Sequence, residues 1–283
     1  MIKTNISITL ALVLFTGCFS LKPELEPLDS KVIPLEWKNP IDTKNQDNLT
    51  QTKPVWEDFV QNETLKKVVS LAIKNNKDLK IALLNIESAR ATYRISKAED
   101  FPKISANGAL TNSKSINSSN GTTISHNYSA TIGASYEIDL FGKIKNLNES
   151  ALQTYLSTQF AANATKVSLV SETINAWFTL ATHTEQLRLS NETVQNLQKA
   201  YELTQKRFTA GVISQAEVLD AKGSLTEAQI NVISYTTMIE QDKNALELLI
   251  AQPLSAELLP KEFNNYENWL LLVKAGISSN ILL

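Results

Sequence analysis

The spacing of hydrophobic and polar residues changes along this chain, and the first stretch with a clear period is helical. Between residues 62 and 99, apolar side chains recur every three or four positions, which predicts amphipathic helices. Two pieces meet near Asn75-Asn76. The first begins near Asn62 or Glu63, and the second ends before Pro102.

The period falls to two in residues 103–112 and 127–138, where apolar side chains alternate with hydroxyl and amide side chains. Each segment has about the length of a strand that crosses an outer membrane at a tilt, with one face in lipid and one in water. A soluble sheet with one buried face shows the same alternation. Residues 113–126, rich in Ser, Asn and Gly, predict a solvent-exposed loop.

The alternation stops at a junction, Tyr136–Lys143, after which the pattern is helical. We expect Tyr136 to lie at the border of the lipid-facing surface, and Glu137 and Asp139 to face water. Gly142 is expected at the tight turn where the strand gives way to the helix. The candidate junction residues are Tyr136, Glu137, Asp139, Phe141 and Gly142.

Residues 143–210 contain neither Gly nor Pro, which predicts one helix on the order of 100 Å long. A second helical arm follows Gly211, and its apolar residues are spaced by seven: Val218, Leu225, Val232, Ile239 and Leu246. The two arms predict an antiparallel coiled-coil hairpin. An ordinary helical hairpin of a soluble protein would show the same heptads.

The turn between the arms, residues 207–218, is a candidate docking site. Gly211 suits a left-handed helix end, and Ser214 with Glu217 suits a capping box. A turn does not require apolar side chains such as those of Val212 and Ile213, and we expect this pair to be exposed for contact with a partner. The candidate docking residues are Arg207, Gly211, Val212, Ile213 and Ser214.

The N-terminus has the pattern of an export signal, with Lys3, an apolar run over residues 6–15 and Gly17 before Cys18. Leu14–Cys18 resembles a lipobox, with Phe15 as an atypical residue, so we expect cleavage after residue 17 and lipidation of Cys18. An ordinary cleaved signal beside a free cysteine is the alternative. Residues 18–54 contain five prolines and predict an extended, lipid-anchored leash.

Composition narrows the functions further. The formal net charge of −2 offers no basic excess, so we expect no nucleic-acid partner. His126 and His183 belong to no cluster with metal-ligand spacing, and we expect solvated or wall positions for them. We therefore expect neither an enzyme nor a bound metal or cofactor.

The order of these segments resembles the TolC-type outer-membrane efflux proteins, especially the NodT/OprM-like lipoprotein branch that serves resistance-nodulation-division pumps. The resemblance covers nearly the whole chain. Its most specific parts are Glu-Ile-Asp-Leu-Phe-Gly-Lys at 137–143 and the tip, where Arg207-Phe208 precedes Gly-Val-Ile-Ser at 211–214.

This resemblance implies a mainly α fold with a two-stranded transmembrane β-hairpin and a long antiparallel coiled-coil helical hairpin, half of a TolC-like protomer. In the full-length family, a homotrimer of two-repeat protomers forms a twelve-stranded barrel above a periplasmic tunnel. The implied function is the outer-membrane channel of a tripartite efflux pump that exports drugs or other small toxic compounds. The implied partners are a periplasmic adaptor that meets the tip, an inner-membrane pump and outer-membrane lipid.

The resemblance also implies a location in the outer membrane through a lipid anchor, with most of the chain in the periplasm. The expected segments are a signal peptide (1–17), the leash (18–54), equatorial or periplasmic helices (55–101), the barrel hairpin (102–141), the helical hairpin (142–252) and a linker (253–283).

Only one repeat is present, and residues 276–283 resemble the linker that opens a second. We therefore expect a truncated family member, of which a trimer would contribute six strands instead of twelve. Six copies, or a separately encoded second half, would restore the strand number. The alternatives from other classes are a periplasmic adaptor lipoprotein with a coiled-coil hairpin, and a structural lipoprotein without transport activity.

Overall fold

The computed structural model describes residues 56–117, 121–260 and 268–271. Cys18, the expected signal peptide and the leash lie outside these residues. Among them, residues 84–160 form one compact unit, and residues 56–83, 161–260 and 268–271 form a second. The elements are α2 (Trp56–Phe59), α3 (Glu63–Asn75), α4 (Lys77–Ala98), β1 (Lys103–Asn117), β2 (Gly121–Ser135), α5 (Lys143–Thr209), α6 (Gln215–Ile250) and the 3-10 helix η2 (Ala256–Leu258).

The predicted break between the first two long helices is present, and asparagine side chains define it. Asn62 caps α3, since its Oδ1 accepts the backbone N–H of Leu65 at 2.9 Å. Asn76 separates α3 from α4, because its Oδ1 accepts the N–H of Leu79 at 2.9 Å and its amide nitrogen donates to the carbonyl of Leu249 at 3.1 Å. The second contact ties the break to the end of α6.

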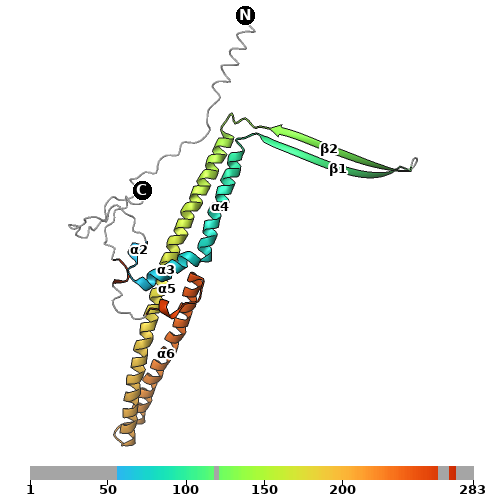
Figure 1. Ribbon diagram of the computed structural model, residues 1–283. Coiled ribbons are helices and arrows are strands. Elements are labelled where there is room, and N and C mark those ends of the chain that lie inside the picture. The colour runs from blue at the N-terminus through green and yellow to red at the C-terminus, as the bar shows by residue number, and fades with distance from the viewer. Residues whose placement is uncertain (1–55, 118–120, 261–267, 272–283) are drawn as a thin grey trace, which may run out of the picture. The chain divides into compact units, whose positions relative to one another are not determined.

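The second unit holds the hydrophobic core, which joins α3 and the middle of α5 to the end of α6. Its largest fully buried side chains include Trp177, Leu65, Leu180, Leu246 and Ile250. Figure 1 shows α5 and α6 as an adjacent pair that ends in a tight turn. Three of the five heptad residues predicted on α6, Leu225, Ile239 and Leu246, are buried, and Val218 and Val232 are half-buried.

The segment after Pro253, expected as a linker, contributes to this core. Trp269 is 6% exposed, and its ring centroid lies 4.8 Å from that of Trp177. Trp177 donates its indole N–H to the carbonyl of Leu258 at 3.1 Å. A bridge between Val60 and Leu270 ties the same segment to the chain before α3. Residues far apart in the sequence therefore close the core.

The first unit contains the β-hairpin, whose two antiparallel strands are longer than the alternation predicted. Each has 15 residues, so most of the expected loop 113–126 is strand, whereas residues 136–138 are not. The pairing continues from Lys103↔Ser135 to Asn117↔Gly121. Polar residues extend the strands because the backbone pairing does not depend on apolar side chains.

Helix contacts in the same unit join α4 to the start of α5. The rings of Tyr93 and Tyr155 stack with centroids 6.4 Å apart. Asn148 accepts a hydrogen bond from Ser96 Oγ at 2.6 Å and donates one to Asp100 at 3.0 Å. Of the helices in the described ranges, none combines the length and apolar character needed to cross a bilayer.

Candidate membrane hairpin, junction and docking tip

The register of the β-hairpin sorts its side chains into two contrasting faces. Even-numbered residues pair with even-numbered residues, so the apolar side chains of both strands share one face. That face is open to solvent, with Ile104 80%, Tyr128 76% and Ile132 85% exposed. The opposite face presents mainly hydroxyl and amide groups, including Ser105, Asn107, Thr131 and Ser129.

At the junction, Gly142 has φ of 75°, in the left-handed region that favours glycine. Helix α5 begins at the next residue. Asp139 Oδ2 accepts the backbone N–H of Lys145 at 2.9 Å, which satisfies one of the free N–H groups of the first turn. Asp139, expected only on the wet side, thus also caps α5.

Glu137 forms an ion pair with a lysine side chain at this turn. Its Oε1 lies 2.9 Å from Lys143 Nζ, and this hydrogen bond raises the pKa of Lys143 above its ordinary value. Tyr136, Ile138 and Phe141 remain 59%, 68% and 65% exposed. The junction therefore combines a charged pair with an exposed apolar border.

The tip of the helical hairpin is a tight turn stabilised by hydrogen bonds. Gly211 has φ of 74°, its N–H donates to the carbonyl of Phe208 at 2.8 Å, and the N–H of Val212 donates to that of Arg207 at 3.0 Å. The carboxylate of Glu217 accepts the N–H of Ser214 at 3.2 Å and its hydroxyl at 3.1 Å.

The exposed apolar surface at the tip differs from the expected pair. Val212 is 73% exposed, but Ile213 is half-buried, so the prediction that both side chains are exposed is wrong for Ile213. Phe208, which precedes the expected docking residues apart from Arg207, is 42% exposed. Arg207 is exposed as well. Phe208 is therefore a candidate docking residue that was not among those expected from the sequence.

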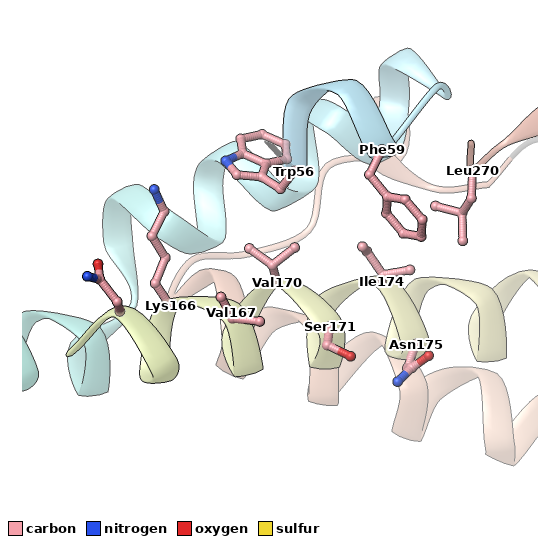
Figure 2. Close-up of a pocket in the computed structure, with 10 residues that line it drawn as sticks. Trp56, Phe59, Lys166, Val167, Val170, Ser171, Ile174, Asn175 and Leu270 are labelled. Atoms are coloured by element: carbon pink, nitrogen blue, oxygen red, sulfur yellow. The ribbon is translucent and has the colours of Figure 1, made fainter. Parts of the chain in front are cut away.

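A pocket of about 610 Å³ lies in the second unit between α2 and α5, beside Leu270. Figure 2 shows Trp56 and Phe59 above Val170 and Ile174 of α5. Lys166, Asn163, Ser171 and Asn175 are its polar lining residues. Sequence periodicity did not indicate this pocket, because its walls come from residues more than 100 positions apart.

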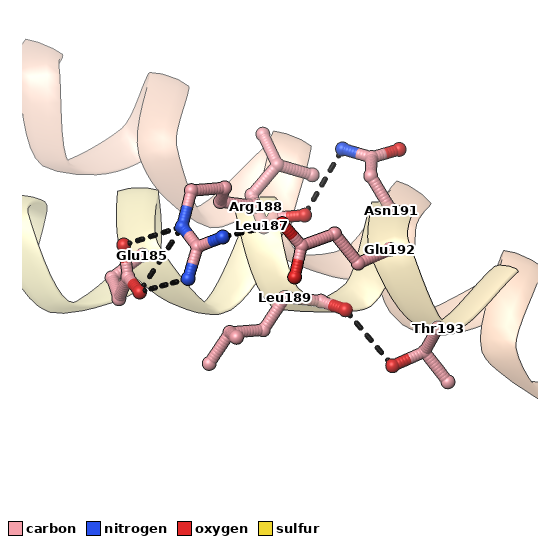
Figure 3. A network of polar contacts seen from close by, with 7 residues as sticks. All are labelled: Glu185, Leu187, Arg188, Leu189, Asn191, Glu192 and Thr193. Atoms are coloured by element: carbon pink, nitrogen blue, oxygen red, sulfur yellow. Dashed lines mark hydrogen bonds and ion pairs between the residues drawn. The ribbon is translucent and has the colours of Figure 1, made fainter. Parts of the chain in front are cut away.

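Two polar arrangements lie on the helical hairpin. In Figure 3, the Arg188 guanidinium lies between Glu185 and Glu192, with Nη2 2.6 Å from Glu185 Oε1 and Nη1 2.5 Å from Glu192 Oε1. The Arg188 hydrogen bond lowers the pKa of Glu185. His183, expected as a solvated or wall residue, lies with Nδ1 2.6 Å from Oδ2 of Asp242 on α6.

These contacts form no metal centre. No group of three or more His, Cys, Asp or Glu side chains within the described ranges could hold a metal ion.

A profile of the outer membrane efflux protein family matches residues 68–252. The chain belongs to this family. The chain is therefore an outer-membrane protein by family, and its family is not that of the periplasmic adaptors. The match runs from α3 to the end of α6 and so includes the β-hairpin, the junction and the tip.

Relatives extend the match to the whole chain. The toluene efflux pump outer membrane protein TtgC of Pseudomonas putida is 31% identical over 288 residues, covering 100% of this chain and 59% of the relative. The cation efflux system protein CusC of Escherichia coli is 32% identical over 230 residues, covering 81% and 49%. The chain thus spans roughly half to three fifths of these relatives.

Solved structures share the fold. A crystal structure of CusC has a TM-score of 0.74 at 26% identity and covers 94% of this chain and 58% of that one. The open-state structure of the Neisseria gonorrhoeae outer membrane channel MtrE has a TM-score of 0.69 at 25% identity, covering 93% and 58%. The chain therefore has the TolC-like outer-membrane channel fold over about half the length of these structures.

Proposed function

We propose that this chain forms part of the outer-membrane channel of a tripartite efflux pump. The observation that carries the proposal is the β-hairpin, in which one face is apolar and exposed and the other carries hydroxyl and amide groups. Leaving a face with Ile104, Tyr128 and Ile132 in water costs about 1.5–3 kcal/mol for each large side chain. Lipid against this face removes that cost, and the polar face then lines a water-filled pore.

Two strands alone leave the backbone N–H and C=O groups on their outer edges unpaired. The described sheet contains only β1 and β2, so each has one edge without a strand partner there. In lipid, unpaired backbone groups cost several kcal/mol each, and further strands must cover these edges. A homotrimer of full-length family members supplies twelve strands, and six copies of this chain or a separately encoded second half would supply the same number.

The helical hairpin then extends into the periplasm, where its tip docks on an adaptor that connects to an inner-membrane pump. Val212 and Phe208 provide apolar contacts, Arg207 provides a charge, and Gly211 holds the turn that presents them. Cys18 carries the lipid anchor, which places the N-terminus at the same membrane.

The transported compounds are small toxic molecules, including drugs, and the channel performs no chemistry on them. The pore face of the hairpin carries one charged side chain, Lys103, among neutral hydroxyl and amide groups. Such a surface does not select strongly by charge. This agrees with relatives whose names specify different cargoes, toluene for TtgC and cations for CusC.

A pair of lysine substitutions on adjacent residues tests the membrane role. Ile132 lies on the apolar face and Thr131 on the opposite face. Lysine on a lipid-facing position costs about 2–4 kcal/mol at the membrane centre. We expect Ile132→Lys to remove the chain from carbonate-resistant outer membranes and to raise dye accumulation in cells that depend on it, whereas Thr131→Lys leaves both near the wild-type level.

Equal recovery of both variants in the outer membrane would contradict the assignment of the two faces. Release of the wild-type chain by carbonate after removal of the lipid anchor would contradict a membrane-inserted hairpin and would favour the peripheral lipoprotein alternative.

A further inference from the structure

The outward, apolar face of the β-hairpin changes character halfway along the strands. Its first four cross-strand pairs, counted from the junction, are Ile104–Ala134, Ala106–Ile132, Gly108–Ala130 and Leu110–Tyr128. The next pair on the same face is Asn112–His126, and Lys114 follows opposite Ile124. All three polar side chains are exposed. Asn112, His126 and Lys114 therefore form a polar cluster on this face, between the four apolar pairs near the junction and Ile116 further along β1.

The position of this change matches the height of a membrane. Tyr136 and His126 are ten residues apart, which corresponds to about 33 Å of extended chain. At a tilt near 40°, this is about 25 Å along the membrane normal, the height of the apolar band of outer-membrane barrels. Tyr128 then lies inside the upper border, where aromatic residues gather. Lys114 lies a few ångströms beyond it, among the lipid headgroups.

Charge and hydrogen bonding at this position suit an anion. Residues 101–136 contain no Asp or Glu, so Lys114 has no acidic neighbour within the hairpin sequence. His126 Nδ1 lies 2.7 Å from Asn112 Oδ1. Because an amide oxygen only accepts, the ring nitrogen donates in this contact, and the Asn112 NH₂ group stays a donor for another ligand. The site therefore offers an ammonium group and an amide donor on the same face, two residues apart along β1.

We propose that Lys114, with Asn112 and His126, binds the phosphate groups of lipids in the outer leaflet. The inference rests on the proposed function, since the hairpin must cross the membrane for these residues to reach the headgroups. A lipid phosphate is favoured over a soluble anion because the three side chains continue the lipid-facing row. The pore face of the same outer half carries no charged residue in the described strands.

Vesicle partitioning of the full chain tests the proposal. The probes are phosphatidylcholine vesicles that contain diphosphoryl lipid A or the same lipid without its phosphates. We expect the wild-type chain to prefer the phosphorylated vesicles. Lys114→Gln should lower the ratio of binding to the two vesicle types about fivefold, which is the contribution of one lysine to binding an anionic surface. Lys103→Gln is the matched control, because it removes the same charge from the opposite face at the junction end.

A fluorophore on Leu110→Cys in a Cys18→Ser background reports insertion separately, through the blue shift of an environment-sensitive dye. Insertion with equal binding to both vesicle types, or an equal loss in Lys103→Gln and Lys114→Gln, would overturn the lipid-phosphate site alone. The absence of a blue shift in the labelled chain that keeps Lys103 and Lys114 would overturn the proposed membrane insertion of the hairpin and this site with it.

Discussion

At the scale of single residues, two glycines lie just outside the ends of α5. Gly142 and Gly211 have φ values of 75° and 74°, and the 67 residues of α5 lie between them. Most residues other than Gly, Asn and Asp pay about 1–2 kcal/mol for this conformation. Their places could be predicted from sequence, because the change of period next to a glycine already indicates a turn.

Gly211 and Gly223 allow this backbone effect to be separated from crowding. A Cβ would meet nothing within 4 Å at either position, but only Gly211 has a positive φ. We expect Gly211→Ala to lower the free energy of unfolding by about 1–2 kcal/mol. Gly223→Ala should raise it by up to about 1 kcal/mol, since Ala is the better helix former. Urea unfolding of the detergent-solubilised chain measures both, and equal effects would contradict strain at the tip.

The same glycine tests the docking proposal. Gly211→Val should weaken crosslinking to a periplasmic adaptor while the chain remains in the outer membrane. Unchanged crosslinking would show that the turn is structural only.

Glu185 provides a pH-dependent effect at the residue scale. Because Arg188 lowers the pKa of Glu185 below 4.5, the stability from this pair is present above about pH 4.5 and is lost as the pH falls through the lower folded-state value. We expect the Tm of Glu185→Gln to fall less than that of the wild type on acidification below pH 4.5. About 1 M salt should shrink the difference, since the pair is exposed to solvent. If the Tm of Glu185→Gln falls as much on acidification as that of the wild type, the pair of Glu185 and Arg188 does not contribute the pH-dependent stability.

At the scale of elements, α5 and α6 were predictable as a pair, but the polar contact between them was not. The heptads indicate an apolar seam, and Leu225, Ile239 and Leu246 are buried there. His183 and Asp242 interrupt it, with 23% and 17% of their side chains exposed. Asp242 stands between the seam residues Ile239 and Leu246 in the sequence, but only the alignment of the two arms shows that His183 is its partner.

This pair predicts non-additive effects of substitution. His183→Leu leaves the carboxylate of Asp242 half-buried without its partner, and we expect a loss of about 1–3 kcal/mol in unfolding free energy. The double variant His183→Leu/Asp242→Leu should recover part of that loss. Lys243→Gln, which removes an exposed ion pair on α6, should change stability by less than about 1 kcal/mol. Additive effects of the two leucine substitutions would show that the contact is not coupled.

At the scale of the whole molecule, three separated stretches build the core of the second unit. The contributing stretches are Val60 to Leu79, the middle of α5, and the end of α6 together with Leu258 and Trp269. Trp177 joins them, because it is 1% exposed and contacts both Leu258 and Trp269. Leu258 and Trp269, which follow α6, are therefore part of the folded unit.

Removing this side chain should destabilise the unit as a whole. We expect Trp177→Ala to lower the free energy of unfolding by about 3–5 kcal/mol, the usual cost of deleting a buried aromatic residue. Phe160→Ala is the control on the same helix, because its side chain is 73% exposed and its loss should cost less than about 0.5 kcal/mol. Near-native stability of Trp177→Ala would contradict the assigned core.

The sequence by itself determined the helices, the alternating strands, their apolar and polar faces and the places of Gly142 and Gly211, because each depends on the spacing of near neighbours. Only the tertiary structure decided how far the strands extend into residues 113–126, which side chain at the tip is exposed, and which residues meet His183 and Trp177. These outcomes depend on cross-strand pairing or on partners 59 and 81 residues away. No local pattern encodes such distances, because they arise only when the chain has packed.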